Sequence, residues 1–220
     1  MGHFFSSDGP LMTYLTMIRD WMLLSVLWLV CSVPVFTLGV STTAMYYVTL
    51  KMAKGEDVPV FKSFFKSFKE NFKQGVWLTL IVLVVGAILL SDCLYFSRVA
   101  GTKGAILTGV FCAVSIGFLT IMLYAFPFMA QFSNSVSGIL KSAVVLAIRN
   151  IKRTGIVLVF HAFPVVLRFV SYEVYMSMFP VWLFLAPGTI AYLCSVCHVK
   201  SFEPLIRAIQ EKRDRSVEET

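Results

Sequence analysis

The stretch VWLTLIVLVVGAILLSDCLYF, residues 76–96, decides the fold, because it holds one acidic residue and no basic one. A helix of about 20 apolar residues crosses about 30 Å of hydrocarbon, so this stretch is long enough to span a bilayer. Similar apolar runs lie on both sides of it, and we expect membrane spans at about residues 21–38, 76–96, 105–129, 155–170 and 178–199. The sequence therefore predicts an all-α fold, a polytopic transmembrane helical bundle of about five spans.

The composition agrees with a membrane protein throughout. Of the 220 residues, 58% are hydrophobic and 14% are charged, whereas a soluble domain has about 45–50% apolar and about 25% charged residues. These values exclude a disordered chain, a fibre and a soluble enzyme. We expect one integral membrane domain over residues 1–210 and a charged, solvated tail over residues 211–220. The first apolar run is expected to remain as an anchor, because it lacks the basic n-region and the cleavage site of a signal peptide.

Basic residues lie mainly in the gap before residue 76, in the gap before residue 155 and after residue 199. Cytoplasmic loops of membrane proteins carry such an excess of Lys and Arg, so these regions are expected to face the cytoplasm. We do not expect them to bind nucleic acid. With five spans, the N-terminus is then outside and the C-terminus is cytoplasmic. The N-terminus moves inside if residues 41–54 re-enter or cross the membrane.

Two amphipathic elbow helices are expected on the cytoplasmic side, at about residues 60–73 and 138–152. In the first, aromatic and basic side chains follow neighbouring helical stripes, Phe61, Phe65, Phe68 and Phe72 beside Lys62, Lys66, Lys69 and Lys73. The phenyl face can enter the acyl boundary of the lipid bilayer, while each ammonium group gains about 1 kcal/mol from anionic head groups. We interpret this helix as a plain anchor; a docking helix for a cytoplasmic partner is the alternative.

The second elbow resembles the first. Its apolar face is expected to hold Leu140, Val144, Ile148 and Ile151. The two elbows align without gaps, since Asn71-x-Lys73 matches Asn150-x-Lys152 and a glycine opens each following span. A duplicated unit of span, elbow and span would explain this match, with both copies pointing the same way; chance similarity is the other explanation.

Few residues could carry chemistry. Cys194-Ser-Val-Cys197-His198 has the form of a haem c attachment site, but it ends a span on the expected cytoplasmic side, whereas haem c is attached outside the cytoplasm. We interpret these residues as apolar helix positions, and we expect no haem, no metal and no other cofactor. No triad, carboxylate pair or phosphate-binding loop stands in the sequence, so neither catalytic residues nor an enzyme activity are expected.

Asp92, His161 and Arg168 are ionisable residues that fall inside the expected spans. Such groups are costly in hydrocarbon and are usually paired or functional. Asp92 and Arg168 lie toward the outer ends of their spans, where they can reach the interface or pair with each other. For His161 we expect a neutral ring with a hydrogen-bond partner rather than a proton relay.

Two further patterns concern helix packing. Gly109, Ala113 and Gly117 sit four residues apart, and such a stripe lets another helix approach closely, either from this chain or from another subunit. The first apolar run is interrupted over residues 34–47, PVFTLGVSTTAMYY, by a proline, a glycine and hydroxyl residues. One of these hydroxyl side chains can cap a new helix that runs toward Lys51.

This interruption is where the sequence resembles the YesL-like family of polytopic bacterial membrane proteins. The resemblance also rests on Asp8-Gly9-Pro10, on Phe64-x-x-x-Phe68-x-x-Asn71-Phe72 and on Tyr124-Ala-Phe-Pro127. It implies the bacterial plasma membrane and a role in carbohydrate uptake, since the family usually accompanies ABC-type sugar importers and glycan-degrading enzymes. It implies no mechanism. The motif positions expected to serve structure or interaction are Pro34, Thr37, Gly39, Ser41, Thr42, Tyr46, Asn71 and Pro127.

These patterns favour a non-enzymatic accessory membrane subunit of an ABC-type oligosaccharide importer, which packs beside the permease subunits through the small-residue stripe or the elbows. Two alternatives stay open. One is a stand-alone transporter or channel for a small solute, indicated by the possible repeat, the prolines within spans and the buried polar groups. The other is a membrane sensor that regulates a sugar-uptake operon through the basic elbows.

Overall fold

The structure is a computed structural model that describes residues 10–218, and every regular element in that range is helical. The all-α fold class is therefore confirmed. In chain order the elements are α1 (Pro10–Cys31), the 3₁₀ turn η1 (Val35–Thr37), α2 (Leu38–Ala53), α3 (Val60–Glu70), α4 (Phe72–Ser97), α5 (Thr102–Gln131), α6 (Val136–Arg149), α7 (Ile151–Val170), α8 (Tyr172–Ser177), α9 (Phe179–Phe184) and α10 (Ala186–Glu218).

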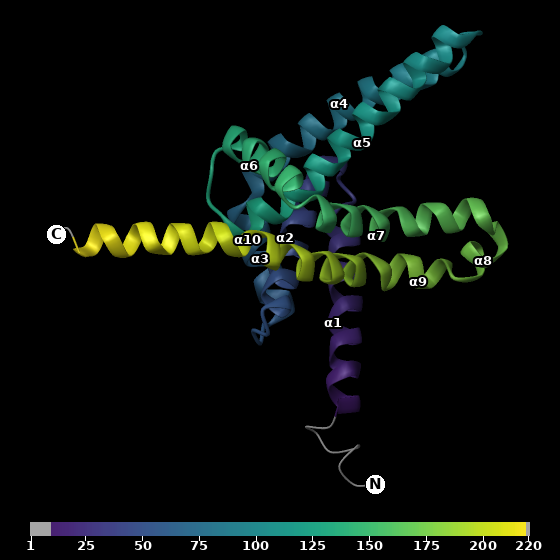
Figure 1. Cartoon of the computed structure of the whole chain (residues 1–220). Coiled ribbons are helices and arrows are strands. Elements are labelled where there is room, and N and C mark those ends of the chain that lie inside the picture. Colours follow the sequence, from purple (N-terminus) through teal and green to yellow (C-terminus); the bar gives the residue numbers. More distant parts are fainter. Residues whose placement is uncertain (1–9, 219–220) are drawn as a thin grey trace.

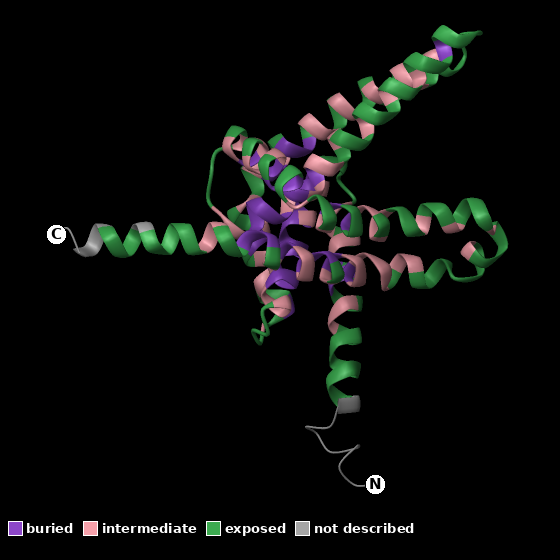
Figure 2. Cartoon of the chain, in the orientation of Figure 1, coloured by how far each residue is buried: buried purple, intermediate pink, exposed green. Residues whose placement is uncertain are grey.

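Several arms run outward from a central cluster of helices (Figure 1). The arms are α1, the α4–α5 hairpin, the hairpin of α7 with α8, α9 and the start of α10, and the C-terminal half of α10. Buried residues gather in the centre, whereas the arms are half-buried or exposed along most of their length (Figure 2). Most of the apolar arm surface is therefore not covered by the part of the chain that the structure describes.

The first apolar run differs from the single span expected over residues 21–38. α1 begins at Pro10, a residue whose fixed φ angle suits a first helical turn. It ends at Cys31, ahead of Pro34, whose ring cannot continue the hydrogen-bond ladder. Thr37 Oγ1 closes the connection by bonding the carbonyls of Cys31 and Pro34, each at 2.6 Å. Residues 41–54 then continue as α2, a full helix.

α2 is the central helix of the molecule, because it contacts α1, α3, α4, α5 and α10 and is buried on nearly every side. Its hydroxyl groups donate to carbonyls one turn earlier, namely those of Ser41, Thr42, Thr43 and Thr49. The Gly39 N–H donates to Thr79 Oγ1 of α4 at 2.9 Å, and a Cβ on Gly39 would collide with that hydroxyl. The small residues of the motif thus permit a close crossing of α2 and α4.

The two elbows are α3 and α6, and an asparagine ends each of them. Asn71 Nδ2 donates to the Ser67 carbonyl and Asn150 Nδ2 donates to the Leu146 carbonyl, both at 3.0 Å. The first elbow ends at Glu70, three residues earlier than expected, because α4 begins directly after Asn71. The shared asparagine geometry supports the structural equivalence of the two elbow–span units; a common duplication remains a prediction.

The elbow faces differ in part from the expected ones. In α3, Phe64 is fully buried against the central helices, while the four lysines of the stripe are exposed. In α6 the buried residues are Ile139, Ala143, Leu146 and Ala147, whereas Ile148 and Ile151 are each 70% exposed. The alanines allow α5 to approach α6 closely, so this small-residue side faces the protein and the bulkier side faces outward.

Four helical segments are long and apolar enough to cross a membrane: Met12–Cys31, Phe72–Ser97, Thr102–Gln131 and Ile151–Val170. The fifth expected span, residues 178–199, is divided between α9 and α10, with a break at Leu185. Pro180 and Pro187 lie in the first turns of these two helices, where proline is tolerated. The charged C-terminal tail continues α10 as a helix to Glu218.

Candidate functional site

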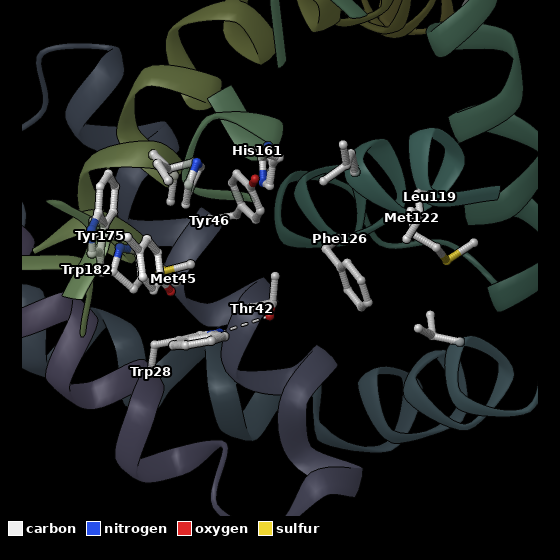
Figure 3. A pocket seen from close by; sticks show the side chains of 17 residues that line it. Trp28, Thr42, Met45, Tyr46, Leu119, Met122, Phe126, His161, Tyr175 and Trp182 are labelled. Atoms are coloured by element: carbon white, nitrogen blue, oxygen red, sulfur yellow. Dashed lines mark hydrogen bonds between the residues drawn. The ribbon is translucent and has the colours of Figure 1, made fainter. Parts of the chain in front are cut away.

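A cavity of about 480 Å³ lies where the two hairpin arms meet the central helices. α2 and the end of α1 form its floor, α4 and α5 line one side, and α7 to α10 line the other. Its volume is within the range of small-molecule sites, about 300–1,000 Å³. Figure 3 shows the aromatic side chains around it, namely Trp28, Tyr46, Phe126, Tyr175 and Trp182.

The motif in α2 fixes the floor of the cavity. Thr42 Oγ1 donates to the Leu38 carbonyl at 2.7 Å and accepts from Trp28 Nε1 at 3.0 Å, the dashed line in Figure 3. This bond holds the indole of α1 against α2. One turn further along α2, the almost fully buried Tyr46 lines the same cavity. Thr42 and Tyr46, two positions of the motif, therefore lie at one site.

Two polar groups in the walls have unused hydrogen-bonding capacity. His161 Nδ1 lies 2.9 Å from the Val157 carbonyl, which can only accept, so Nδ1 carries the proton and Nε2 keeps its lone pair. The Trp182 indole N–H is shielded from solvent and has no partner among the described residues. Its ring stacks on Tyr175, with 5.9 Å between centroids. The walls thus combine an apolar, aromatic surface with one acceptor and one donor.

Behind the floor lies a buried imidazole. His198 of α10 is fully buried among the rings of Tyr46, Tyr124 and Phe202. Neither ring nitrogen has a partner among the described residues. The Cys-x-x-Cys-His pattern therefore places its histidine in the protein centre, and no cluster of three His, Cys, Asp or Glu side chains in the described range could hold a metal ion.

Sequence reasoning did not single out His198 as a central residue. The available signal was the spacing of Ser195, His198 and Ser201, which puts three polar residues on one side of a helix inside an apolar run. All three are buried. Polar residues at helical spacing in such a run mark the side of the helix that meets protein rather than lipid.

Hydroxyl groups tie the central helices together. Thr49 Oγ1 and Ser195 Oγ are 2.7 Å apart and join α2 to α10. Tyr124 Oη lies 2.9 Å from Thr154 Oγ1 and joins α5 to α7. Because the Thr154 hydroxyl donates to a carbonyl of the preceding elbow, it accepts from the tyrosine. The Gly188 N–H donates to Ser25 Oγ at 2.9 Å and joins α10 to α1.

The small-residue stripe lies away from this site. A Cβ on Gly109 or Gly117 would meet no atom within 4 Å, and Ala113 is exposed. The stripe therefore does not pack within the described part of this chain. The other motif proline, Pro127, is buried inside α5 and has a structural role there.

The intramembrane ionisable residues are not brought together. The Arg168 guanidinium lies over the Tyr172 and Tyr175 rings, 5.4 and 5.9 Å from their centroids. It forms no ion pair with Asp92 in the described structure, and Asp92 is half-buried on the other arm. Of the three residues, His161 alone lines the cavity.

Comparison with known proteins finds similarity in the part of the chain that contains α2. The family model described as "Protein of unknown function, DUF624" matches residues 21–93, which include all of α2 and α3. The chain is 33% identical over 129 residues to the uncharacterized protein YesL of Bacillus subtilis (strain 168), which covers 56% of this chain and 60% of that protein. The chain thus spans less than two thirds of the length of this relative, and no solved structure matches it. The resemblance to the YesL-like family seen in the motifs is therefore confirmed as a similarity, to the DUF624 family model and to YesL.

Proposed function

We propose that this protein is a non-enzymatic accessory membrane subunit of an ABC-type carbohydrate importer and that it packs beside the permease helices. The uncovered face of the α4–α5 arm carries the proposal. Along that face Gly109, Ala113 and Gly117 leave open space where larger side chains would stand. A stripe of this kind lets the backbone of another transmembrane helix come close, and contact with lipid tails alone requires no such stripe.

The carbohydrate part of the proposal rests on the YesL-like resemblance. It implies that the gene for this protein lies beside genes for sugar import. The location follows from the same resemblance and from the apolar helices, and we place the protein in the bacterial plasma membrane. The three exposed lysines of α3 and Lys73 at the start of α4 suit a cytoplasmic surface with anionic head groups.

Two contacts support a cytoplasmic position for both ends of the described chain. The first turns of α1 share a pocket with Glu56 and Asp57, which precede the elbow α3. Arg153, which follows the elbow α6, donates to the Lys200 carbonyl at 2.8 Å. α2 is a full helix that runs back toward the side where α1 begins. We therefore assign the start of α1 to the cytoplasmic side, the side of the two elbows. A count of five spans predicts the outer side.

The test is purification of the tagged protein from its own host in mild detergent, with mass spectrometry of the retained proteins. Wild type is expected to retain permease subunits in near-stoichiometric amounts. A Gly109→Leu/Gly117→Leu variant is expected to retain far fewer permease subunits, because the larger side chains keep a neighbouring helix from the close approach that the stripe permits. Its own yield and melting temperature should not fall, since no atom of residues 10–218 would contact a Cβ on Gly109 or Gly117.

A Val110→Leu/Val114→Leu variant is the matched control. Both valines are about half-exposed on the neighbouring face of the same helix, so the control carries the same two leucine side chains away from the stripe. The proposal fails if wild type never retains permease subunits, and a clean single species would favour the stand-alone transporter or the sensor. Equal losses in both variants would move the contact away from the stripe.

A further inference from the structure

We propose that the cavity between the arms binds a neutral membrane lipid with a hydroxyl-bearing head group, of the diacylglycerol class. The site differs from the arm face assigned to the permease, so it stands or fails independently of the importer. Its occupant follows from the charge, the polar groups and the shape of the walls.

The charge of the walls selects a neutral ligand. Among the described residues that line the cavity there is no Asp, Glu, Lys or Arg. A phosphate or an ammonium group would therefore be buried without a counter-ion, which is strongly unfavourable. This excludes the zwitterionic and anionic head groups of ordinary membrane lipids from the cavity.

The polar groups select a ligand with few hydrogen-bonding atoms. Within residues 10–218 the Trp182 N–H has no acceptor, and His161, whose Nδ1 donates to the Val157 carbonyl, has no donor on Nε2. An ester carbonyl can accept from the indole, and a single free hydroxyl can donate to the imidazole, so a diacylglycerol supplies both partners. A free sugar carries several hydroxyl groups, and most of them would be buried without partners against the aromatic walls.

The shape provides a place for an acyl chain. A second, apolar groove of about 420 Å³ runs along α7, α9 and the start of α10. It shares Trp182, Ala186 and Ile190 with the cavity, so the two spaces adjoin. The head of the lipid then occupies the cavity, and one chain continues in the groove past Phe163. Entry is lateral, between two arms whose outer surfaces are apolar and exposed.

The test uses the purified full chain in phosphatidylcholine vesicles that contain a small fraction of diacylglycerol with a photoreactive diazirine in one acyl chain. After irradiation, mass spectrometry locates the adducts. They are expected within residues 159–164 and 181–193, which line the groove. Unlabelled diacylglycerol should compete, and added phosphatidylcholine should not.

Trp182→Phe is expected to lower the adduct yield about fivefold, the factor that corresponds to one hydrogen bond. Trp77→Phe is the matched control, because Trp77 is exposed on α4 and does not line the cavity. A second variant, Ala186→Phe, fills the space between cavity and groove and should remove the localised adducts. The melting temperature of each variant reports whether it is folded.

Three results would overturn the proposal. The first is adducts spread over all arms in the same pattern for diacylglycerol and phosphatidylcholine probes. The second is an adduct yield in folded Trp182→Phe equal to that of Trp77→Phe. The third is displacement of the probe by a free oligosaccharide, which would assign the cavity to sugar. Because no permease is present, none of these results depends on the importer assignment.

Discussion

The two hairpin arms leave the same centre but are built differently. α4 and α5 are unbroken helices of 26 and 30 residues, and Phe96 stacks on Phe111 between them. The other arm is broken at Ser171, Met178 and Leu185. In an unbroken helix all backbone hydrogen bonds are made within the helix, so its outer side can contact lipid or another helix. Non-helical backbone at membrane depth is tolerated where it is buried in protein or lines a cavity. The comparison teaches that the first arm is suited to contact and the second to binding.

The attachment of the first arm to the centre should give the largest effect. Gly39→Leu drives a side chain into Thr79 and the Phe126 ring at the crossing of α2 with α4, so we expect a loss of about 3 kcal/mol in the free energy of unfolding. Thermal unfolding in detergent measures it. Gly86→Ala is the control on the same arm, because open space surrounds Gly86 and alanine is the better helix former. Similar melting temperatures for both variants would contradict the close crossing.

The link between the two arms should give a smaller effect. Tyr124→Phe removes the hydrogen bond that joins α5 to α7 and keeps the ring against His198. We expect a loss of about 1 kcal/mol in the free energy of unfolding. Tyr95→Phe, on the exposed outer part of α4, should leave the free energy unchanged. If Tyr124→Phe were as stable as Tyr95→Phe, the link would not contribute to stability.

The buried imidazole should give the smallest effect. His198 has two shielded nitrogens without partners in the described structure, and leucine would remove their desolvation cost. His198→Leu is therefore expected to change the free energy of unfolding by less than about 1 kcal/mol, with either sign. A larger loss in the same thermal assay would mean that His198 holds a polar partner needed for the fold.

Apolar run length was enough to predict the all-α fold class, and the motifs were enough to predict the similarity to YesL. Long apolar runs directly predict membrane spans, and the Phe/Lys pattern of α3 predicts a helix at the membrane interface. The face of α6 was not predictable in the same way, because both its sides are apolar. Only side-chain size distinguishes the two sides: the small Ala143 and Ala147 face the protein, and the bulkier Ile148 faces outward.

The candidate site was less predictable than the fold. Thr42 and Tyr46 were found through the motif, and His161 through its position in a span. Trp182 and Tyr175 were not, because aromatic residues are common in every apolar run and nothing local says which ones meet. The central place of α2 was hidden as well, since a helix buried on all sides has no polar face.

The most direct test of the difference between the arms is site-specific photocrosslinking in living cells. A benzophenone amino acid is placed at Ala113 on the first arm or at Val166 on the second, both exposed positions. We predict protein adducts with a permease subunit from position 113 and lipid adducts alone from position 166. Absence of a protein adduct at 113, or the same protein adducts at both positions, would contradict the account.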